Sequence, residues 1–244
     1  RGFVLCGRIQ MPGLVDQAPI VIRTDDLGFP QWINIYIDSI FSSTTFASAF
    51  DIHALNTSDE GIIVSGYTSQ FVTGDRDSLL LRLNGAGNVL WAKTYGHVGF
   101  TDMGYGCDEA ADGDLIMHGF NKVAGEGGGT YLLRTDPFGN MSWHTIFRQF
   151  NSISSSMQET PAGDIVMCGL ATDFAGFEEP SILLTDSVGG LAWNMAYTAT
   201  AQGFPESVVP TQDDGYHLWA WGNDLPFGSF DLYSVKTDAV GSSG

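Results

Sequence analysis

The sequence repeats a short motif five times, and this repetition constrains the fold more than any other feature. In the four complete copies an Asp or Asn is followed by Gly after three residues and by Trp after seven. The fifth copy ends before a Trp. The motif residues are Asp25, Gly28 and Trp32; Asn84, Gly87 and Trp91; Asp136, Gly139 and Trp143; Asp186, Gly189 and Trp193; and Asp238 and Gly241.

A second marker runs in phase with the first. Each copy also contains a short apolar run that ends in Gly, and these are Gly7, Gly66, Gly119, Gly169 and Gly222. Both markers recur every 50 to 59 residues along the chain. Two markers that share one period indicate a single supersecondary unit, repeated.

Each period divides into four short strands. In the third unit we expect them at residues 89–95, 104–110, 115–119 and 131–135. Four strands in about 50 residues are the content of one propeller blade. The sequence therefore predicts an all-β fold, a β-propeller of about five four-stranded blades, with residues 1–244 as one domain. Residues 1–25 hold only two strands of a unit, so one blade is half encoded, and sequence beyond either end or a neighbouring molecule would supply the rest.

The motif has a structural explanation. In Asp-x-x-Gly the Asp side chain caps a tight turn and the Gly takes the positive-φ position that ends it. The Trp begins the next strand, where it can fill the space between adjacent blades. The basic residues that precede the turns are expected to form a ring of charge-assisted contacts. They are Arg23, Arg82, Arg134 and Lys236.

Composition excludes some classes of partner. Ten Lys and Arg against 28 Asp and Glu give a net charge of −18, which repels the phosphates of nucleic acids and the headgroups of anionic membranes. No run approaches the roughly 18 apolar residues of a membrane span. We therefore predict no nucleic-acid partner and no membrane insertion. The three cysteines are widely spaced, and we expect them to be buried in strands rather than paired.

The turn sequences resemble those of a known group. The stretches Asp214-Gly215-Tyr216 and Lys236-Thr237-Asp238, with Gly61, Gly113 and Gly163 as turn glycines elsewhere, are similar to the repeats of secreted β-propeller proteins of Bacteroidetes-type bacteria. Leu83 and Leu184 depart from the pattern. The resemblance covers the whole chain. It implies a propeller fold and an extracellular or cell-surface location, commonly reached by type IX secretion.

Standard catalytic and cofactor motifs are absent from the sequence. There is no G-x-S-x-G, H-E-x-x-H, P-loop or calcium-loop pattern. The five histidines lack the spacing of metal ligands, and we expect His118 and His217 to be ordinary strand residues. The sequence therefore predicts no catalytic residues, no cofactor and no metal.

The connections between the third and fourth strands vary while the repeat markers hold. Such loops emerge on one face of a ring and commonly carry recognition. Here they mix aromatic and acidic residues, which suit a glycan or a protein partner. The candidate binding residues are Phe71, Asp75, Asp77, Phe174, Phe177, Glu178, Glu179, Asp224, Phe227 and Phe230.

Three functions follow from these features. The first is a non-catalytic extracellular module for protein or glycan binding or for assembly, including assembly with copies of itself through open strand edges. The alternative is a secreted polysaccharide-active enzyme with carboxylates on the propeller face. That enzyme requires two carboxyl groups roughly 5–9 Å apart in a cleft, at least one with a raised pKa. The third function is Ca²⁺-dependent glycan binding through loop oxygens.

Overall fold

The computed structural model describes residues 2–10, 17–36, 45–70, 75–123, 127–148, 154–172, 178–197, 203–224 and 229–243. These ranges contain 18 strands and no helix, which confirms the predicted all-β class. The strands are β1 (Val4–Gln10), β2 (Gln17–Thr24), β3 (Pro30–Ile35), β4 (Thr45–Ala54), β5 (Ile62–Gln70), β6 (Arg76–Leu83), β7 (Val89–Tyr95), β8 (Phe100–Glu109), β9 (Leu115–Val123), β10 (Gly128–Thr135), β11 (Met141–Phe147), β12 (Ser154–Glu159), β13 (Ile165–Thr172), β14 (Glu178–Thr185), β15 (Leu191–Ala196), β16 (Gly203–Pro210), β17 (Tyr216–Asp224) and β18 (Ser229–Thr237).

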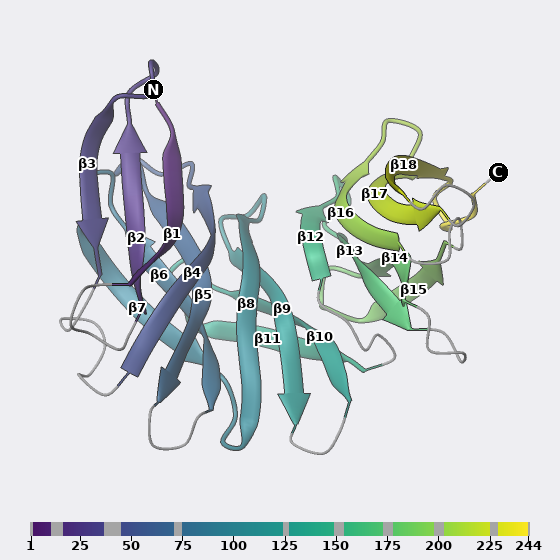
Figure 1. Cartoon of the computed structure of the whole chain (residues 1–244), viewed down its shortest axis with the longest axis horizontal. Helices are drawn as coiled ribbons and strands as arrows, with labels where there is room; N and C mark the ends of the chain where they lie inside the picture. The colour runs from purple at the N-terminus through teal and green to yellow at the C-terminus, as the bar shows by residue number, and fades with distance from the viewer. Residues whose placement is uncertain are drawn as a thin grey trace.

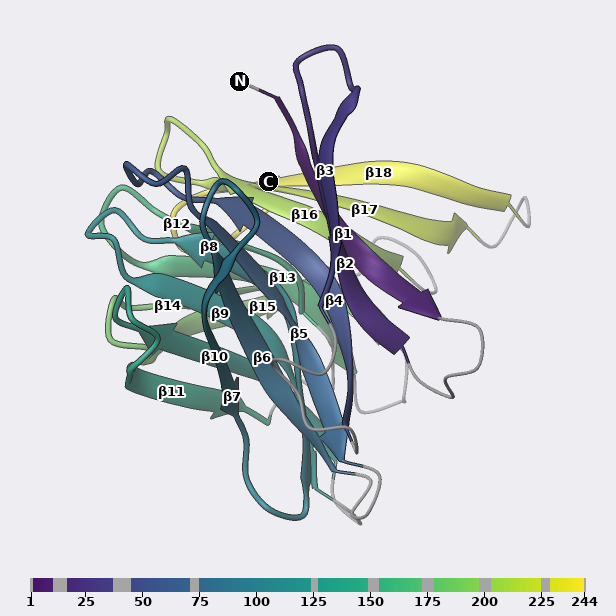
Figure 2. The same ribbon diagram turned by 90° about the vertical axis from the view of Figure 1, so that its left-hand side faces the viewer.

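The strands form antiparallel meanders that follow one another around an arc (Figure 1). Strands β1–β3 and β16–β18 form three-stranded sheets, and β12–β15 form a four-stranded sheet. Strands β4–β11 belong to one sheet, in which two four-strand meanders are joined by the single parallel pair Arg76 and Thr101. The first and last sheets flank an opening in the arc (Figure 1). A view turned by 90° shows the strands of each meander running side by side (Figure 2).

The strand that carries the repeated Trp closes one meander and does not open the next. Strand β7 pairs with β6 along its length, and β11 and β15 pair in the same way with β10 and β14. The predicted division of the repeat was therefore wrong by one strand. The strand count of the half-encoded blade changes as well. In the described residues the first sheet has three strands rather than the predicted two, and the last sheet also has three.

The glycines of the second marker lie inside strands, which corrects the prediction that the apolar runs end there. Strand β5 continues past Gly66 to Gln70, and β9 continues past Gly119 to Val123. A Cβ on Gly66 would collide with the Ser48 carbonyl oxygen of the adjacent strand, and one on Gly119 with that of Met103. Only glycine allows the neighbouring backbone to approach this closely.

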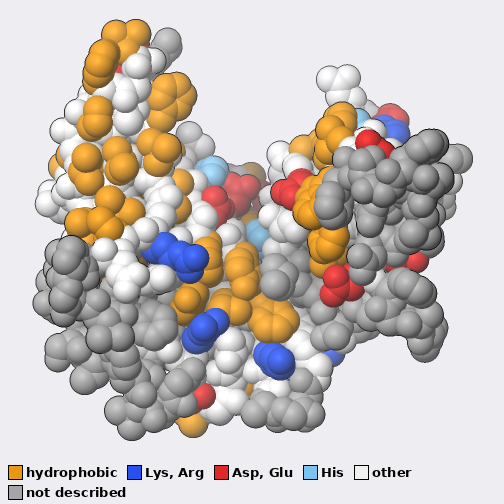
Figure 3. Space-filling model, in the orientation of Figure 1, with side chains coloured by type: hydrophobic (Ala, Val, Ile, Leu, Met, Phe, Trp, Pro, Cys, Tyr) orange, Lys and Arg blue, Asp and Glu red, His pale blue; other side chains and the backbone are white. Residues whose placement is uncertain are grey.

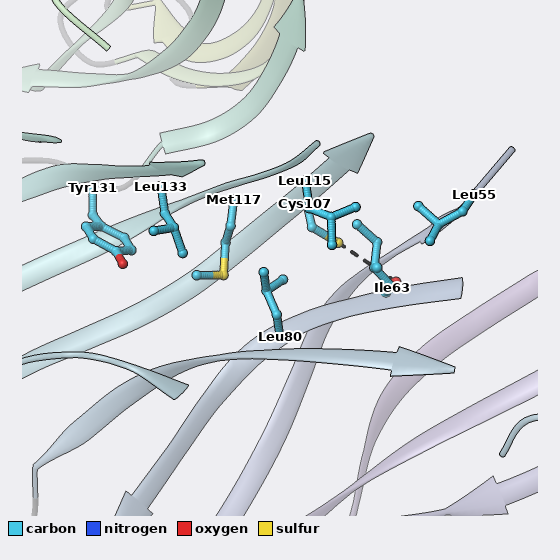
Figure 4. Close-up of a cluster of buried hydrophobic side chains, with 8 residues drawn as sticks. All are labelled: Leu55, Ile63, Leu80, Cys107, Leu115, Met117, Tyr131 and Leu133. Atoms are coloured by element: carbon cyan, nitrogen blue, oxygen red, sulfur yellow. Dashed lines mark hydrogen bonds between the residues drawn. The ribbon is translucent and has the colours of Figure 1, made fainter. Parts of the chain in front are cut away.

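Hydrophobic clusters lie between successive meanders, and each cluster draws on two of them. One cluster joins Ile63 and Leu80 to Met117 and Leu133, all 0 % exposed (Figure 4). The Cys107 thiol lies in the same cluster and donates to the Ile63 carbonyl oxygen at 3.9 Å. Each meander in the middle of the arc therefore buries both faces, as near-continuous apolar runs require. Within the described part of the chain, no helix has the length and apolar character to cross a membrane.

The Asp-x-x-Gly turns have the predicted geometry. Gly28, Gly87, Gly139, Gly189 and Gly241 all have positive φ, between +73° and +88°. In the first turn the Asp25 carboxylate accepts the backbone N–H groups of Leu27 and Phe29 at 3.0 and 2.9 Å, and the other turns repeat this pattern. The prediction of a capped turn that only Gly can end is confirmed.

The repeated Trp links adjacent repeats, as predicted. The Trp32 indole donates to the Gly85 carbonyl oxygen at 3.1 Å, across to the following turn. A Cβ on the turn glycine of that repeat, Gly87, would lie 3.1 Å from the Trp32 ring, so the ring packs closely against the turn. Trp91, Trp143 and Trp193 pack in the same way on later turns.

The basic residues beside the turns pair with carboxylates of loops at the same end of the sheets. Arg82 makes a bidentate contact with Asp59 at 2.9 and 3.0 Å. Arg134 contacts Asp112 at 2.6 Å and Asp114 at 2.9 Å. Arg23 pairs with Glu60, and Lys236 with Asp213. The predicted charge-assisted contacts are confirmed, and all of them lie at the end of the sheets that carries the turns, which we call the turn end.

Candidate functional site

Three aspartates gather at the opposite end of the sheets, which we call the loop end. Successive connections of an antiparallel meander alternate between its two ends, so β5–β6 and β7–β8 connect at the end away from the Asp-x-x-Gly turns. Asp75 immediately precedes β6, Asp77 is its second residue, and Asp102 lies near the start of β8. We call these three residues the loop-end aspartates.

Gly96 allows two of these carboxylates to converge. It follows β7, and a Cβ at this position would collide with Asp77 Oδ1 and lie 3.1 Å from Asp102 Oδ2. Both oxygens are therefore within 3.1 Å of a single point, which any side chain larger than hydrogen would occupy. The absence of a side chain at residue 96 brings Asp77 and Asp102 together from two different meanders.

Burial and mutual repulsion raise the pKa of Asp77. The partial burial of its carboxylate is the largest cause, and the negative charges of Asp102 and Asp75 add to it, opposed by His97. Burial also raises the pKa of Asp102, opposed by hydrogen bonds from Asn121 and from the His97 backbone N–H. Two neighbouring acidic groups in a partly buried site have higher pKa values than either group would have in water.

A polar network fixes Asp102 in place. Its Oδ1 accepts from Asn121 Nδ2 at 2.5 Å, and its Oδ2 accepts from the His97 backbone N–H at 3.2 Å. The His97 ring lies 5.6 Å from that of His144, centroid to centroid. The Arg148 guanidinium donates to Asn121 Oδ1 at 3.4 Å. Such second contacts hold a carboxylate in one orientation.

The aspartates differ in their access to solvent. Asp102 is 1 % exposed and cannot contact a large ligand, whereas Asp75 and Asp77 are partly exposed. Asp75 Oδ2 accepts the Gly99 backbone N–H at 3.2 Å, which anchors it beside the β7–β8 connection. Asp75 and Asp77 are two residues apart, so their side chains project from the same side of the chain. This arrangement provides two accessible carboxylates, one of which has a raised pKa.

The structure brings together only part of the predicted set of binding residues. Asp77 lies in β6 and Glu178 and Glu179 are the first residues of β14, so these three belong to strands rather than to loops. Asp224 ends β17 and Phe230 is the second residue of β18. Four of the predicted residues lie outside the described residues, and they are Phe71, Phe174, Phe177 and Phe227.

The neighbours of Asp77 could not be recognised in the sequence, because Asp102, Gly96 and His97 belong to no repeat marker. Gly96 and His97 follow β7, which pairs with β6, and Asp102 approaches Asp77 from the next meander. His118 is a buried strand residue as predicted, with its Nδ1 2.6 Å from Ser154 Oγ. In the described ranges, no three His, Cys, Asp or Glu side chains are grouped so as to hold a metal ion.

Comparison with known proteins rests on structure alone, because no protein-family model and no curated protein matches the sequence. A protein of unknown function from Dyadobacter fermentans DSM 18053 shares the fold with a TM-score of 0.59 and 12 % identity, over 94 % of this chain and 66 % of its own. The Hadza microbial sialidase Hz136 matches with a TM-score of 0.63 and 12 % identity, over 99 % of this chain and 55 % of its own. The chain thus spans between about half and two thirds of the length of these two proteins.

The fold is therefore β-propeller-like and is shared with a glycoside hydrolase. This finding corrects the first functional hypothesis. A non-catalytic module was the leading interpretation of the sequence, and the prediction that the chain is not an enzyme followed from it. Because a sialidase shares this fold, the fold gives no ground for excluding the alternative, an enzyme with carboxylates on the propeller face.

Proposed function

We propose that this chain is part of a glycoside hydrolase in which Asp77 donates the proton that releases the leaving group. The observation that carries the proposal is the raised pKa of Asp77, caused by burial and by the charges of Asp102 and Asp75 at a position that solvent still reaches. A general acid for glycoside cleavage needs a pKa above the ordinary carboxyl value, and burial beside other negative charges shifts the pKa in that direction.

The three loop-end aspartates take different roles. The proton of Asp77 passes to the glycosidic oxygen as the bond from that oxygen to the anomeric carbon breaks. Asp75 is the second carboxylate, and it accepts a proton from the water that attacks the anomeric carbon. Two residues along an extended chain span roughly 7 Å, which leaves room for that water. Asp102 is buried, and we assign it as a positioning residue that raises the pKa of Asp77 through its charge.

The repeat supports the wider architecture of this proposal. We infer that the meanders are blades of a propeller and that the glycan is the partner of the whole protein. The resemblance of the turns to secreted bacterial repeat proteins supports export to the cell surface or beyond. Detection of the native protein in culture medium or on intact cells, against a cytoplasmic marker, would test that location.

The test of the proposal is hydrolysis by the full 244-residue chain. We expect release of nitrophenol from at least one member of a panel of nitrophenyl glycosides. Asp77→Asn should lower kcat by about 10²- to 10⁴-fold, the usual contribution of a general acid. A leaving group of low pKa needs less protonation, so dinitrophenyl glycosides should lose less activity than nitrophenyl glycosides in the same variant.

Two further variants separate catalysis from folding. Asp26→Asn removes an exposed carboxylate at the turn end and should leave kcat unchanged. Gly96→Ala retains every carboxylate but displaces Asp77, and it should lower kcat and move the alkaline limb of the pH profile. Equal activity of wild type and Asp77→Asn on every substrate, or no hydrolysis at all, would contradict the proposal.

A further inference from the structure

The first strands of three successive meanders carry a β-bulge at the same place in the repeat. The extra residue is Phe50 in β4, Tyr105 in β8 and Ser155 in β12. Each bulge lies opposite the marker glycine of the neighbouring strand, Gly66 in the case of Phe50. A bulge redirects a side chain out of the regular alternation, and bulges are common beside binding sites. Gly66 and Gly119 make room for the backbone that immediately precedes the bulge on the neighbouring strand.

The three bulges surround one cavity. Strand β8 contacts both β4 and β12 on the inner side of the arc, and a cavity of about 360 Å³ is lined by residues of all three strands. Its lining includes the three bulged residues together with Asp51, His118 and Ser156. The space-filling view shows Asp, Glu and His side chains gathered in the hollow between the first and last sheets (Figure 3). A volume of this size suits a small ligand.

An aromatic surface forms one wall of the cavity. The Phe50 and Tyr105 rings stack with their centroids 5.0 Å apart and an interplanar angle of 25°. The Tyr67 ring supports Phe50 from behind at 5.5 Å. Phe50 remains 38 % exposed although it is a large apolar residue on an inner strand. A rigid, exposed aromatic face offers a ligand apolar contact at low entropic cost.

Polar groups border this surface. Asp51 Oδ2 accepts the Cys107 backbone N–H at 3.0 Å, which fixes the carboxylate on the cavity wall. Burial lowers the pKa of His118 to about 4, so its ring is neutral at physiological pH. The Ser155 and Ser156 residues complete the polar lining. A fixed carboxylate accepts hydrogen bonds from hydroxyl groups and repels anions. The residues that line the cavity include no Lys or Arg to neutralise its negative charge.

We infer that this cavity, the bulge pocket, binds a neutral pyranose ring of the glycan substrate. The ring's C–H groups contact the exposed part of the Phe50–Tyr105 pair, and its hydroxyl groups donate to Asp51. The inference deepens the proposed function and rests on it, because it treats the pocket as a subsite for the glycan that Asp77 cleaves. It goes further in naming the class of sugar: a neutral ring rather than a uronic or other acidic one.

The experiment measures sugar binding by calorimetry at 4 °C, using the full chain and its Asp77→Asn variant. The probes are cellotetraose, xylotetraose and mannotetraose, with tetragalacturonate as the anionic counterpart. We expect at least one neutral probe to bind. Phe50→Ala should weaken that binding about tenfold or more, and Phe50→Trp should preserve it. Phe29→Ala, an exposed aromatic at the turn end, is the matched control and should have no effect.

The outcomes separate this inference from the proposed function. Neutral sugar binding that depends on Phe50 supports the pocket, even if Asp77→Asn hydrolyses as fast as wild type and the catalytic proposal fails. Binding that is unchanged in Phe50→Ala, tighter binding of tetragalacturonate than of every neutral probe, or no binding at millimolar concentrations overturns the inference. A thermal midpoint of Phe50→Ala close to that of wild type shows that a loss of binding is not a loss of folding.

Discussion

The pKa values of aspartate carboxyl groups shift in opposite directions at the two ends of the sheets. At the turn end the Asp114 backbone N–H and the Arg134 guanidinium lower the pKa of Asp112, and the Thr57 hydroxyl and Arg82 lower that of Asp59. At the loop end burial and neighbouring negative charge raise the pKa of Asp77. The aspartate pKa is therefore lowered at the turn end and raised at the loop end.

This difference distinguishes residues that stabilise the repeat from residues available for chemistry. A carboxylate whose pKa is lowered contributes stability at neutral pH, because its charged form is favoured in the folded state. A carboxylate whose pKa is raised costs stability at neutral pH. Proteins tolerate such local costs chiefly at functional sites. The contrast therefore supports the loop end as the site, and two measurements of stability test it, the one with the larger expected effect first.

Removal of the Arg134 guanidinium should have the largest effect. Arg134 is 8 % exposed and lies near three carboxylates, those of Asp112, Asp114 and Glu159. Arg134→Met should lower the free energy of unfolding by about 2 kcal/mol, less than for a fully buried pair because the carboxylates retain contact with water. Denaturant unfolding at pH 7 would measure this loss.

Lys236→Met is the matched control at the same end. Its ammonium group pairs with Asp213, and both side chains are well exposed, so the loss should stay below about 1 kcal/mol. The pKa of Asp112 is lowered in the folded state, so its contribution is present at neutral pH and is lost as the pH falls through the folded-state pKa. The loss of unfolding free energy caused by Arg134→Met should therefore be smaller at acid pH. A loss that does not change with pH would contradict the proposed difference between the two ends.

Neutralisation of Asp77 should have a smaller effect of opposite sign. Its pKa is raised on folding, so the wild type is favoured by protonation and loses stability as the pH rises through the folded-state pKa. Asp77→Asn does not titrate, and at pH 7 it should be more stable than wild type, by less than about 2 kcal/mol. The gain should vanish near pH 3. Thermal unfolding from pH 3 to 8 would measure it, and a variant less stable than wild type at pH 7 would contradict the account.

The repeat made much of the fold predictable. The Asp-x-x-Gly spacing determines a turn by local chemistry alone, and the following Trp reaches the next repeat at a fixed distance. The pairing of the Trp strand was not predictable, because a strand between two turns can join either neighbouring meander. The bulges could not be predicted from the marker glycines. A glycine such as Gly66 is required by the backbone of a neighbouring strand, here that of Ser48, and that contact exists only in the folded chain.

The candidate site was predictable only in part. Asp75 and Asp77 stood out because they lie in a variable connection, and the structure places them at the loop end. Asp102 lies 25 residues further along the chain, and only the packing of β8 beside β6 brings its charge near Asp77. Burial is the largest cause of the raised pKa values of Asp77 and Asp102 among 28 acidic residues, and burial is a property of the folded chain.

The most direct test of the central claim is an NMR titration of the aspartate side-chain carboxyl carbons. Selective labelling and single Asp→Asn variants would assign Asp77 and Asp112 in the full chain. The account predicts that Asp77 titrates above the ordinary aspartate value of about 3.9 and Asp112 below it. Titration of Asp77 at or below the value for Asp112 would contradict the claim that the loop end holds the acid.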